Sequence, residues 1–234
     1  MYRIVIKSKT AYFRNDVTCT SYQESFNCPP LSTIYGLIAA SYGEYRYDIN
    51  IGYLFNYEIK DRDFELVLRK EDKYKKLYYQ MKIDNRFSRN DILRGCFGTI
   101  PVIREVLYNC KLILYIDNLK VAKSFNQPQY PLLLGRSEDL ASVDEKPQLI
   151  HLQNINKPVN FGNTIIPFKI GKIIPGRISK MNIQISQDIP RKIERLGIFK
   201  IVDRIWDNID ISQFGKYDPV HDVGIYIHKG LKSV

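Results

Sequence analysis

Residues 26–43 read FNCPPLSTIYGLIAASYG and contain the signals that start and stop a helix. Two prolines interrupt the preceding chain, and Ser32 and Thr33 carry hydroxyl groups that commonly cap a helix N-terminus. Apolar residues then recur at helical spacing, and Gly43 is typical of a left-handed C-cap. The segment predicts a helix of about three turns, whose open backbone N–H groups favour an anion. An ordinary buried helix with good caps is the alternative.

The composition of the 234-residue chain predicts a folded protein with a packed core. Hydrophobic residues make up 44% and charged residues 26%, a balance typical of globular domains. The length allows one large domain or two small ones. The apolar runs are too short to cross a bilayer, and the first residues read as a strand rather than a signal peptide. We therefore expect a soluble, cytoplasmic protein without a membrane partner.

The cysteines and histidines give no pattern for a metal site. The four cysteines include no Cys-x-x-Cys pair, and the chain has only three histidines. In a cytosolic protein such thiols are best read as small, buried or half-buried side chains. The sequence predicts neither a bound metal nor a cofactor. The cysteines are Cys19, Cys28, Cys96 and Cys110.

The net charge of +10 is concentrated in two segments. Residues 69–94 hold nine basic against four acidic side chains, and residues 164–204 hold nine against three. The remaining residues carry a net charge of −1. Such clustering predicts two basic faces and points to polyanionic partners. For the second segment, a nucleic-acid surface, a subunit surface and a merely soluble hairpin all remain open.

Aromatic side chains are interleaved with the basic ones in residues 69–94. Lysine and arginine neutralise phosphates, and flat rings accept unstacked bases, so this mixture suits single-stranded RNA. A solvated amphipathic hairpin is the alternative for the same pattern. The rings are those of Tyr74, Tyr78, Tyr79 and Phe87.

Hydrophobic periodicity predicts the order of the elements. We expect, around the helix, a strand at 2–9, a loop at 10–28, a strand at 45–60 broken near Gly52, a strand at 64–69, a short helix at 99–109, a strand at 111–117, a short helix at 119–125 and a strand at 149–153. Without an inserted hairpin this order is βαββαβ, the ferredoxin-like α+β plan that RNA-recognition domains share. Residues 155–234 follow as a small β-rich extension, with strand candidates on either side of Pro175-Gly176.

Several motifs occur in a characteristic order along the chain. They are Ala11-Tyr-Phe-Arg14, Pro29-Pro-Leu-Ser-Thr33 with Gly36-Leu37, Pro101-Val-Ile-Arg-Glu-Val-Leu107, and Leu134-Gly-Arg-Ser137. Together they resemble the Cas five family, the RAMP-type subunit of type I CRISPR surveillance complexes (Cascade), with subtype I-B favoured. The motifs span residues 1 to about 140, and the last third of the chain matches only loosely.

The resemblance implies a non-catalytic subunit that caps the repeat-derived 5′ handle of the crRNA. It implies a ferredoxin-like domain at 1–154, with a thumb inserted at about 61–110 that grips RNA. It also implies contacts with a Cas seven-type backbone subunit and a Cas eight-type large subunit. Within the matched motifs and the thumb, the expected RNA-binding residues are Arg3, Lys7, Tyr12, Arg14, Ser32, Thr33, Lys75, Lys76, Arg86, Arg89, Arg94, Arg136 and Ser137.

Two other functions compete with this interpretation. Metal-independent cleavage of repeat RNA needs a general base and an acid or cation at the leaving oxygen. The candidate imidazoles are His151, His221 and His228, which do not form a recognisable set with tyrosine and lysine. We expect no catalysis, and a structural role in a strand for His151. The third possibility is a basic assembly protein whose charge meets acidic partner surfaces.

Overall fold

The computed structural model describes residues 1–234 except 16–17, 19–20, 71–96, 171–173, 190 and 232–234. Strands predominate over helices in this part of the chain, so the predicted α+β class is confirmed. The chain forms two compact units. The larger comprises residues 1–14, 25–61 and 106–234, and the smaller comprises 15–24 and 62–105.

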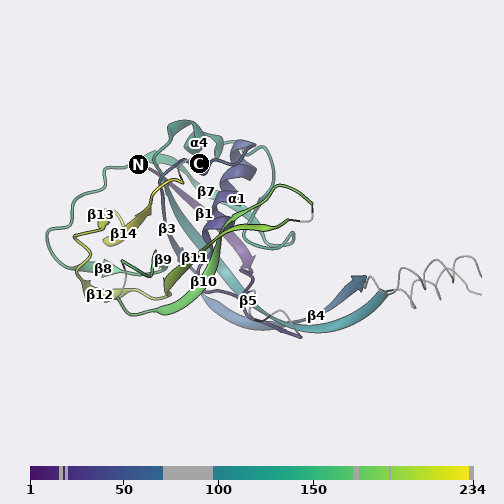
Figure 1. Ribbon diagram of the computed structural model, residues 1–234. Coiled ribbons are helices and arrows are strands. Elements are labelled where there is room, and N and C mark those ends of the chain that lie inside the picture. The colour runs from purple at the N-terminus through teal and green to yellow at the C-terminus, as the bar shows by residue number, and fades with distance from the viewer. Residues whose placement is uncertain (16–17, 19–20, 71–96, 171–173, 190, 232–234) are drawn as a thin grey trace, which may run out of the picture. The chain divides into compact units, whose positions relative to one another are not determined.

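The larger unit is built on a mixed sheet (Figure 1). Four neighbouring strands lie in the order β3, β5, β1, β7, and each is antiparallel to the next. Strand β6 continues the sheet beyond β7, while β14, β8 and β12 continue it beyond β3, and β13 pairs with β14. The bounds are β1 Tyr2–Ala11, β3 Ile51–Asn56, β5 Phe97–Ile116, β6 Leu132–Leu133, β7 Leu140–Leu149, β8 Val159–Phe161, β12 Trp206–Ile209, β13 Gly215–Asp218 and β14 Val223–His228.

A separate three-stranded sheet lies in the order β10, β11, β9. Strands β9 and β10 lie on either side of Pro175-Gly176, where two strands were predicted. Each of them pairs with β11 rather than with the other. The bounds are β9 Thr164–Pro167, β10 Arg177–Ile185 and β11 Ile193–Val202. In the smaller unit, β2 (Tyr22–Gln23) pairs with β5, and β4 (Ile59–Lys70) runs into that unit from the larger one.

Helix α1 spans Leu31–Tyr42 and ends at Gly43 as predicted. Gly43 has a φ of 99°, and its N–H donates to the Ala39 carbonyl at 2.8 Å. The predicted N-cap is wrong, because Pro30 holds that position and no side chain caps the helix. Ser32 and Thr33 therefore belong to the first turn.

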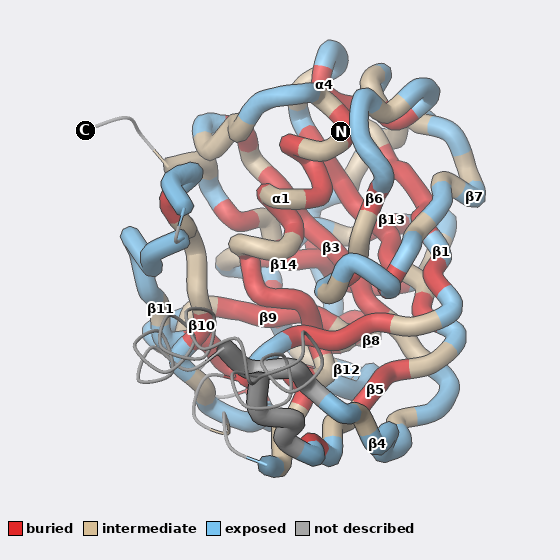
Figure 2. The backbone as a smooth tube through the Cα atoms, turned by 90° about the vertical axis from the view of Figure 1, so that its right-hand side faces the viewer, coloured by how far each residue is buried: buried red, intermediate tan, exposed pale blue. Residues whose placement is uncertain are grey.

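The central strands of the sheet are buried, as their red colour in Figure 2 shows, and core clusters lie on both faces of the sheet. On one face, Ile4 and Ile6 of β1 pack in the same cluster as Ile34 and Ile38 of α1. This cluster also takes in side chains of the small sheet, among them Phe199. On the other face, Val5 packs in a cluster with residues of β3, β5 and β14.

The short helix α4 spans Leu119–Ser124, close to its predicted range. Val121 and Phe125 are buried as expected, and the Asn118 side chain accepts hydrogen bonds from two backbone N–H groups of the first turn. The apolar strand predicted at 111–117 is the end of β5, and its residues 112–116 are buried between the two clusters.

Three predicted elements are wrong. Residues 45–50 are not a strand, because Tyr45 and Tyr47 stack beside α1 instead of alternating in a ladder. Residues 99–109 are not a helix but part of β5, where pairing with β1 and β2 overrides the local pattern. The strand predicted at 149–153 is misplaced, because the last strand of this region is β7, which ends at Leu149.

The stability of the protein should fall in mild acid because of His228. Its ring is buried among Tyr53, Phe199 and Tyr226, and its Nε2–H donates to the Ile165 carbonyl at 3.1 Å. Burial lowers the pKa of His228 to about 4. The unfolded chain therefore binds a proton near pH 6.5 that the folded chain excludes, and stability is lost as the pH falls from 6.5 toward 4.

Between pH 7.5 and pH 5 we expect this histidine to lower the free energy of unfolding by about 2 kcal/mol. Urea unfolding at both pH values measures the difference. In His228→Gln, which does not titrate, the difference should shrink by that amount. The same pH dependence in the variant would contradict the assignment.

Candidate functional site

A groove of about 680 Å³ runs along the side of α1 in the larger unit. Ser32 and Thr33 line it from the first turn of the helix, and Gly135 lines it from the loop before β7. The structure thus brings these predicted positions together. Gly36, which belongs to the same matched motif, also lines the groove. Lining residues that the sequence did not single out include Tyr45, Tyr47, Tyr130, Gln187 and Arg191.

Tyrosine rings form a ladder beside α1. The buried Tyr35 meets Tyr47 edge to face at a centroid distance of 4.9 Å, and Tyr47 is stacked with Tyr45 at 5.5 Å and an interplanar angle of 13°. Burial raises the pKa of Tyr47 to about 12, so its hydroxyl is protonated at neutral pH. Both spacings are typical of attractive ring pairs.

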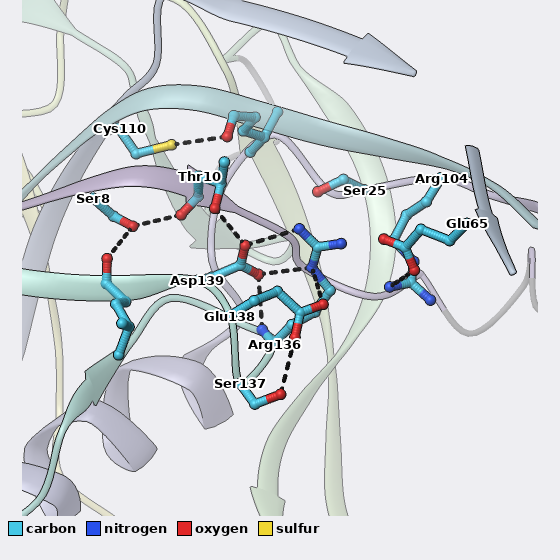
Figure 3. Close-up of polar contacts among 12 residues, drawn as sticks. Ser8, Thr10, Ser25, Glu65, Arg104, Cys110, Arg136, Ser137, Glu138 and Asp139 are labelled. Carbon is cyan, nitrogen blue, oxygen red and sulfur yellow. Dashed lines mark hydrogen bonds and ion pairs between the residues drawn. The ribbon is translucent and has the colours of Figure 1, made fainter. Parts of the chain in front are cut away.

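The loop before β7 is held by the carboxylate of Asp139, which is fully buried (Figure 3). Asp139 accepts hydrogen bonds from the Arg136 backbone N–H at 2.8 Å, from Arg136 Nε and Nη2 at 3.0 Å each, and from Thr10 Oγ1 at 2.7 Å. The Arg136 guanidinium also lies 5.9 Å from the centre of the Tyr12 ring. Arg136 therefore organises this loop through the protein's own groups.

The neighbouring residues of the loop fit the same arrangement. Gly135 has a φ of 127°, and a Cβ atom there would lie 2.0 Å from the Tyr12 carbonyl oxygen. Tyr12 itself is buried, and its N–H donates to the Leu134 carbonyl at 3.2 Å. Ser137 is exposed, and its hydroxyl donates to Glu138. Of the predicted RNA-binding residues here, Ser137 is exposed, Arg136 is half-buried and Tyr12 is buried.

Arg3 and Lys7 lie away from the groove, because they alternate on β1 with Ile4 and Ile6, which face α1. Lys7 is exposed, and its Nζ lies 2.9 Å from Asp144. Arg3 is buried, a placement that favours a structural role over contact with RNA. Its guanidinium donates to Gln148 and to His221 Nδ1, and lies 3.8 Å from Asp218 and 3.9 Å from Glu145.

Of the other predicted cations outside the groove, the structure describes only Arg14. Arg14 is exposed, and its backbone forms an isolated antiparallel β-bridge with Ser25. The thumb residues Lys75, Lys76, Arg86, Arg89 and Arg94 lie outside the described residues.

In the described part of the smaller unit, basic groups pair with carboxylates or rings. Arg104 lies 2.7 Å from Glu65, and Arg62 lies 5.4 Å from the centre of the Tyr22 ring. The Tyr22 hydroxyl donates to Glu105, and this bond raises the pKa of the tyrosine.

The three histidines occupy separate environments. His151 is exposed and outside any strand, contrary to the strand position predicted for it. His221 accepts from Arg3, and burial lowers its pKa, so the ring is neutral at neutral pH. His228 is the buried histidine of the core.

Within the described ranges, no group of three or more His, Cys, Asp or Glu side chains is placed to hold a metal ion. Cys28 and Cys110 are buried free thiols, and burial raises the pKa of Cys110 to about 12. The described helices are all too short or too polar to cross a bilayer.

Comparison with known proteins gives a likeness of fold and not of sequence. No protein-family model and no curated protein sequence matches this chain. A chain of a CRISPR RNA-guided surveillance complex superposes with a TM-score of 0.54 at 12% identity, covering 95% of this chain and 92% of its own. A chain of the Type III-B Cmr-beta complex bound to cognate target RNA and AMPPnP gives 0.58 at 10% identity, covering 95% and 98%.

A further structure of Type III-B Cmr-beta bound to cognate target RNA gives a TM-score of 0.52 at 11% identity, covering 87% of this chain and 85% of that one. The protein therefore shares its fold, over 87–95% of its length, with chains of a CRISPR RNA-guided surveillance complex and of Type III-B Cmr-beta.

The geometry of the loop before β7 leads to a stability prediction. Asp139→Ala should lower the free energy of unfolding by about 3 kcal/mol, because Arg136 and Thr10 lose their buried acceptor. Glu138→Ala is the matched control, since its carboxylate is 57% exposed and lies 3.4 Å from the same guanidinium. An exposed pair contributes at most about 1 kcal/mol. Equal losses in urea unfolding of the two variants would contradict the role given to Asp139.

Proposed function

We propose that the protein is a non-catalytic subunit of a type I CRISPR surveillance complex, of the Cas five family, that binds and caps the 5′ handle of the crRNA. The observation that carries the proposal is the fold that this chain shares, over 95% of its length, with a chain of a CRISPR RNA-guided surveillance complex. The matched sequence motifs add the family, with subtype I-B as the favoured branch.

The arrangement of the sheet supports a ferredoxin-like plan for the RNA-binding domain. Strands β1, β3, β5 and β7, with α1 and α4 as connections, follow one another as βαββαβ. Their order in the sheet, β3-β5-β1-β7, is compatible with that plan. The compact unit of residues 15–24 and 62–105 supports a thumb inserted at about 61–110.

In this proposal the RNA backbone passes the groove where Ser32, Thr33 and Gly135 meet. Hydroxyl groups of the two side chains offer hydrogen bonds to phosphates or to ribose 2′-hydroxyls. The exposed Arg14 and Ser137 supply further polar contacts, and the basic residues 69–94 supply most of the positive charge. The partners are a Cas seven-type backbone subunit and a Cas eight-type large subunit.

Membership of a type III effector is a second candidate, because the Cmr-beta chain gives the TM-score of 0.58. Reconstitution separates the two. A stable complex with the type I backbone and large subunits, formed on crRNA, supports the proposal. Assembly with type III subunits and not with these would refute it.

An endoribonuclease that makes the 5′ end is the catalytic alternative. Incubation of the purified protein with unprocessed repeat RNA and EDTA tests it. We expect the RNA to stay intact. Specific cleavage that is lost on replacement of His151, His221 or His228 would overturn the non-catalytic assignment.

The basic thumb leads to a binding prediction. Replacing Lys75 and Lys76 together by Glu should weaken handle binding by about ten-fold or more at low salt and by less at high salt, because two phosphate contacts are lost. Fluorescence anisotropy at several salt concentrations measures the effect. Lys120 and Lys157, which are exposed and outside the thumb, give a control with the same change of charge. Equal losses in both pairs would show that net charge, not the thumb, holds the RNA.

A further inference from the structure

Tyr130 combines an exposed ring with a fixed backbone. Its side chain is 59% exposed, yet its N–H donates to the Ala40 carbonyl at 2.9 Å. The preceding Gln129 N–H donates to the Ser41 carbonyl at 3.2 Å. These bonds satisfy carbonyls at the end of α1 that the helix itself leaves open. Pro131 further restricts the backbone of Tyr130.

An exposed tyrosine on a flexible loop would need no explanation, since single exposed apolar side chains are normal. Here the main chain beside the ring is bonded to a helix end and followed by proline, so the ring is presented at the groove with little loss of conformational freedom on binding. Tyr130 and Tyr45 both line the groove.

Tyr45 is the outer member of the ladder Tyr35–Tyr47–Tyr45. Tyr35 is 1% exposed and anchors the ladder in the core, while Tyr45 is partly exposed at the groove. Parallel stacking of Tyr45 on Tyr47 shows that this position accepts flat rings face to face. A further flat ring can continue such a ladder at the distances that aromatic pairs favour.

Gly36 leaves the floor of the groove open. A Cβ atom added there would have no atom within 4 Å, so packing does not require the glycine. Glycine inside a helix is less stable than alanine by about 1 kcal/mol. Its position in the lining allows a ligand to approach the helix backbone closely.

We propose that this groove is a base-stacking site for single-stranded RNA, in which Tyr45 and Tyr130 hold unpaired bases and the helix passes close to the sugar–phosphate chain at Gly36. This inference rests on the proposed function and deepens it, because it names the side chains that would read an unpaired handle. Ser32 and Thr33 offer hydroxyls to the ribose and phosphate, and Arg191 offers a cation.

RNA fits the groove better than a protein segment does. Rings and hydroxyl groups together match the faces and edges of unstacked bases and the ribose 2′-hydroxyl. The lining carries Arg191 and the acidic Glu44, so stacking rather than net charge has to supply the affinity. The salt dependence of binding therefore distinguishes the roles of the residues.

The probe is a short, fluorescein-labelled oligoadenylate, and the readout is anisotropy at several salt concentrations. Tyr45→Ala and Tyr130→Ala should each weaken binding about five-fold or more, with an unchanged salt slope because no charge is removed. Arg191→Gln should lower the slope by about one. Tyr45→Phe and Tyr130→Phe keep the ring and should bind within about two-fold of the unmodified protein.

Two controls separate stacking from general damage. Tyr217→Ala removes a half-buried ring outside both the groove lining and the thumb and should leave the affinity unchanged. Duplex RNA of the same length has its bases already stacked, so the Tyr→Ala variants should bind it as the unmodified protein does. If an alanine variant unfolds, photo-crosslinking of the unmodified protein to 4-thiouridine RNA replaces it, and crosslinked peptides should contain Tyr45 or Tyr130.

The outcomes distinguish this inference from the proposed function. If the protein binds handle RNA and the Tyr→Ala variants bind oligoadenylate and handle equally well, the stacking site is refuted and the proposed function stands. If the variants keep RNA affinity but no longer assemble with the Cas seven-type subunit, the groove is a protein interface. If the unmodified protein binds neither RNA, both ideas fail.

Discussion

Helix α1 has an apolar side that must be buried and another side that lines the groove, and the rest of the larger unit is arranged around these two sides. Ile34 and Ile38 must be removed from water, and they pack against the sheet in one cluster with Ile4 and Ile6. This burial is non-directional and favours any close packing. The orientation of the helix is fixed at its C-terminal end, where Gly43 turns the chain and the backbone N–H groups of residues 129 and 130 donate to the Ser41 and Ala40 carbonyls. The remaining side of α1 is left facing the groove.

The elements that could be predicted from the sequence are those whose local pattern and tertiary role agree. Helix α1 and helix α4 have clear stop or cap residues, and the apolar end of β5 is buried on both sides. Prediction failed where the two conflict. The alternation at 45–50 is real, but its tyrosines stack beside a helix, and residues 99–109 are drawn into a strand by their partners on β1 and β2. Local periodicity carries no information on such partners.

The candidate site was predicted in part, for a related reason. Residue type identifies groups able to bind phosphate, but the neighbours decide whether they are available for it. Arg3 lies beside the buried carboxylate of Asp218, which is distant in the sequence. Arg136 donates to the buried carboxylate of Asp139, which follows it closely in the same loop. Ser32 and Thr33 do line a groove, although not as caps. Tyr45 and Tyr130 escaped notice because nothing in the sequence shows that residues so far apart border one surface.

The pairing of β14 with β3 brings Ile227 opposite Gly52. These residues are separated by most of the chain, so the pairing of β3 with β14 in the middle of the sheet joins segments that lie far apart in the sequence. During synthesis β3 emerges long before its neighbour exists, and one of its edges stays unpaired for that time. Such long-range pairing slows folding and leaves an edge open to wrong partners. A chain of this topology completes its main sheet only once β14 has been synthesised.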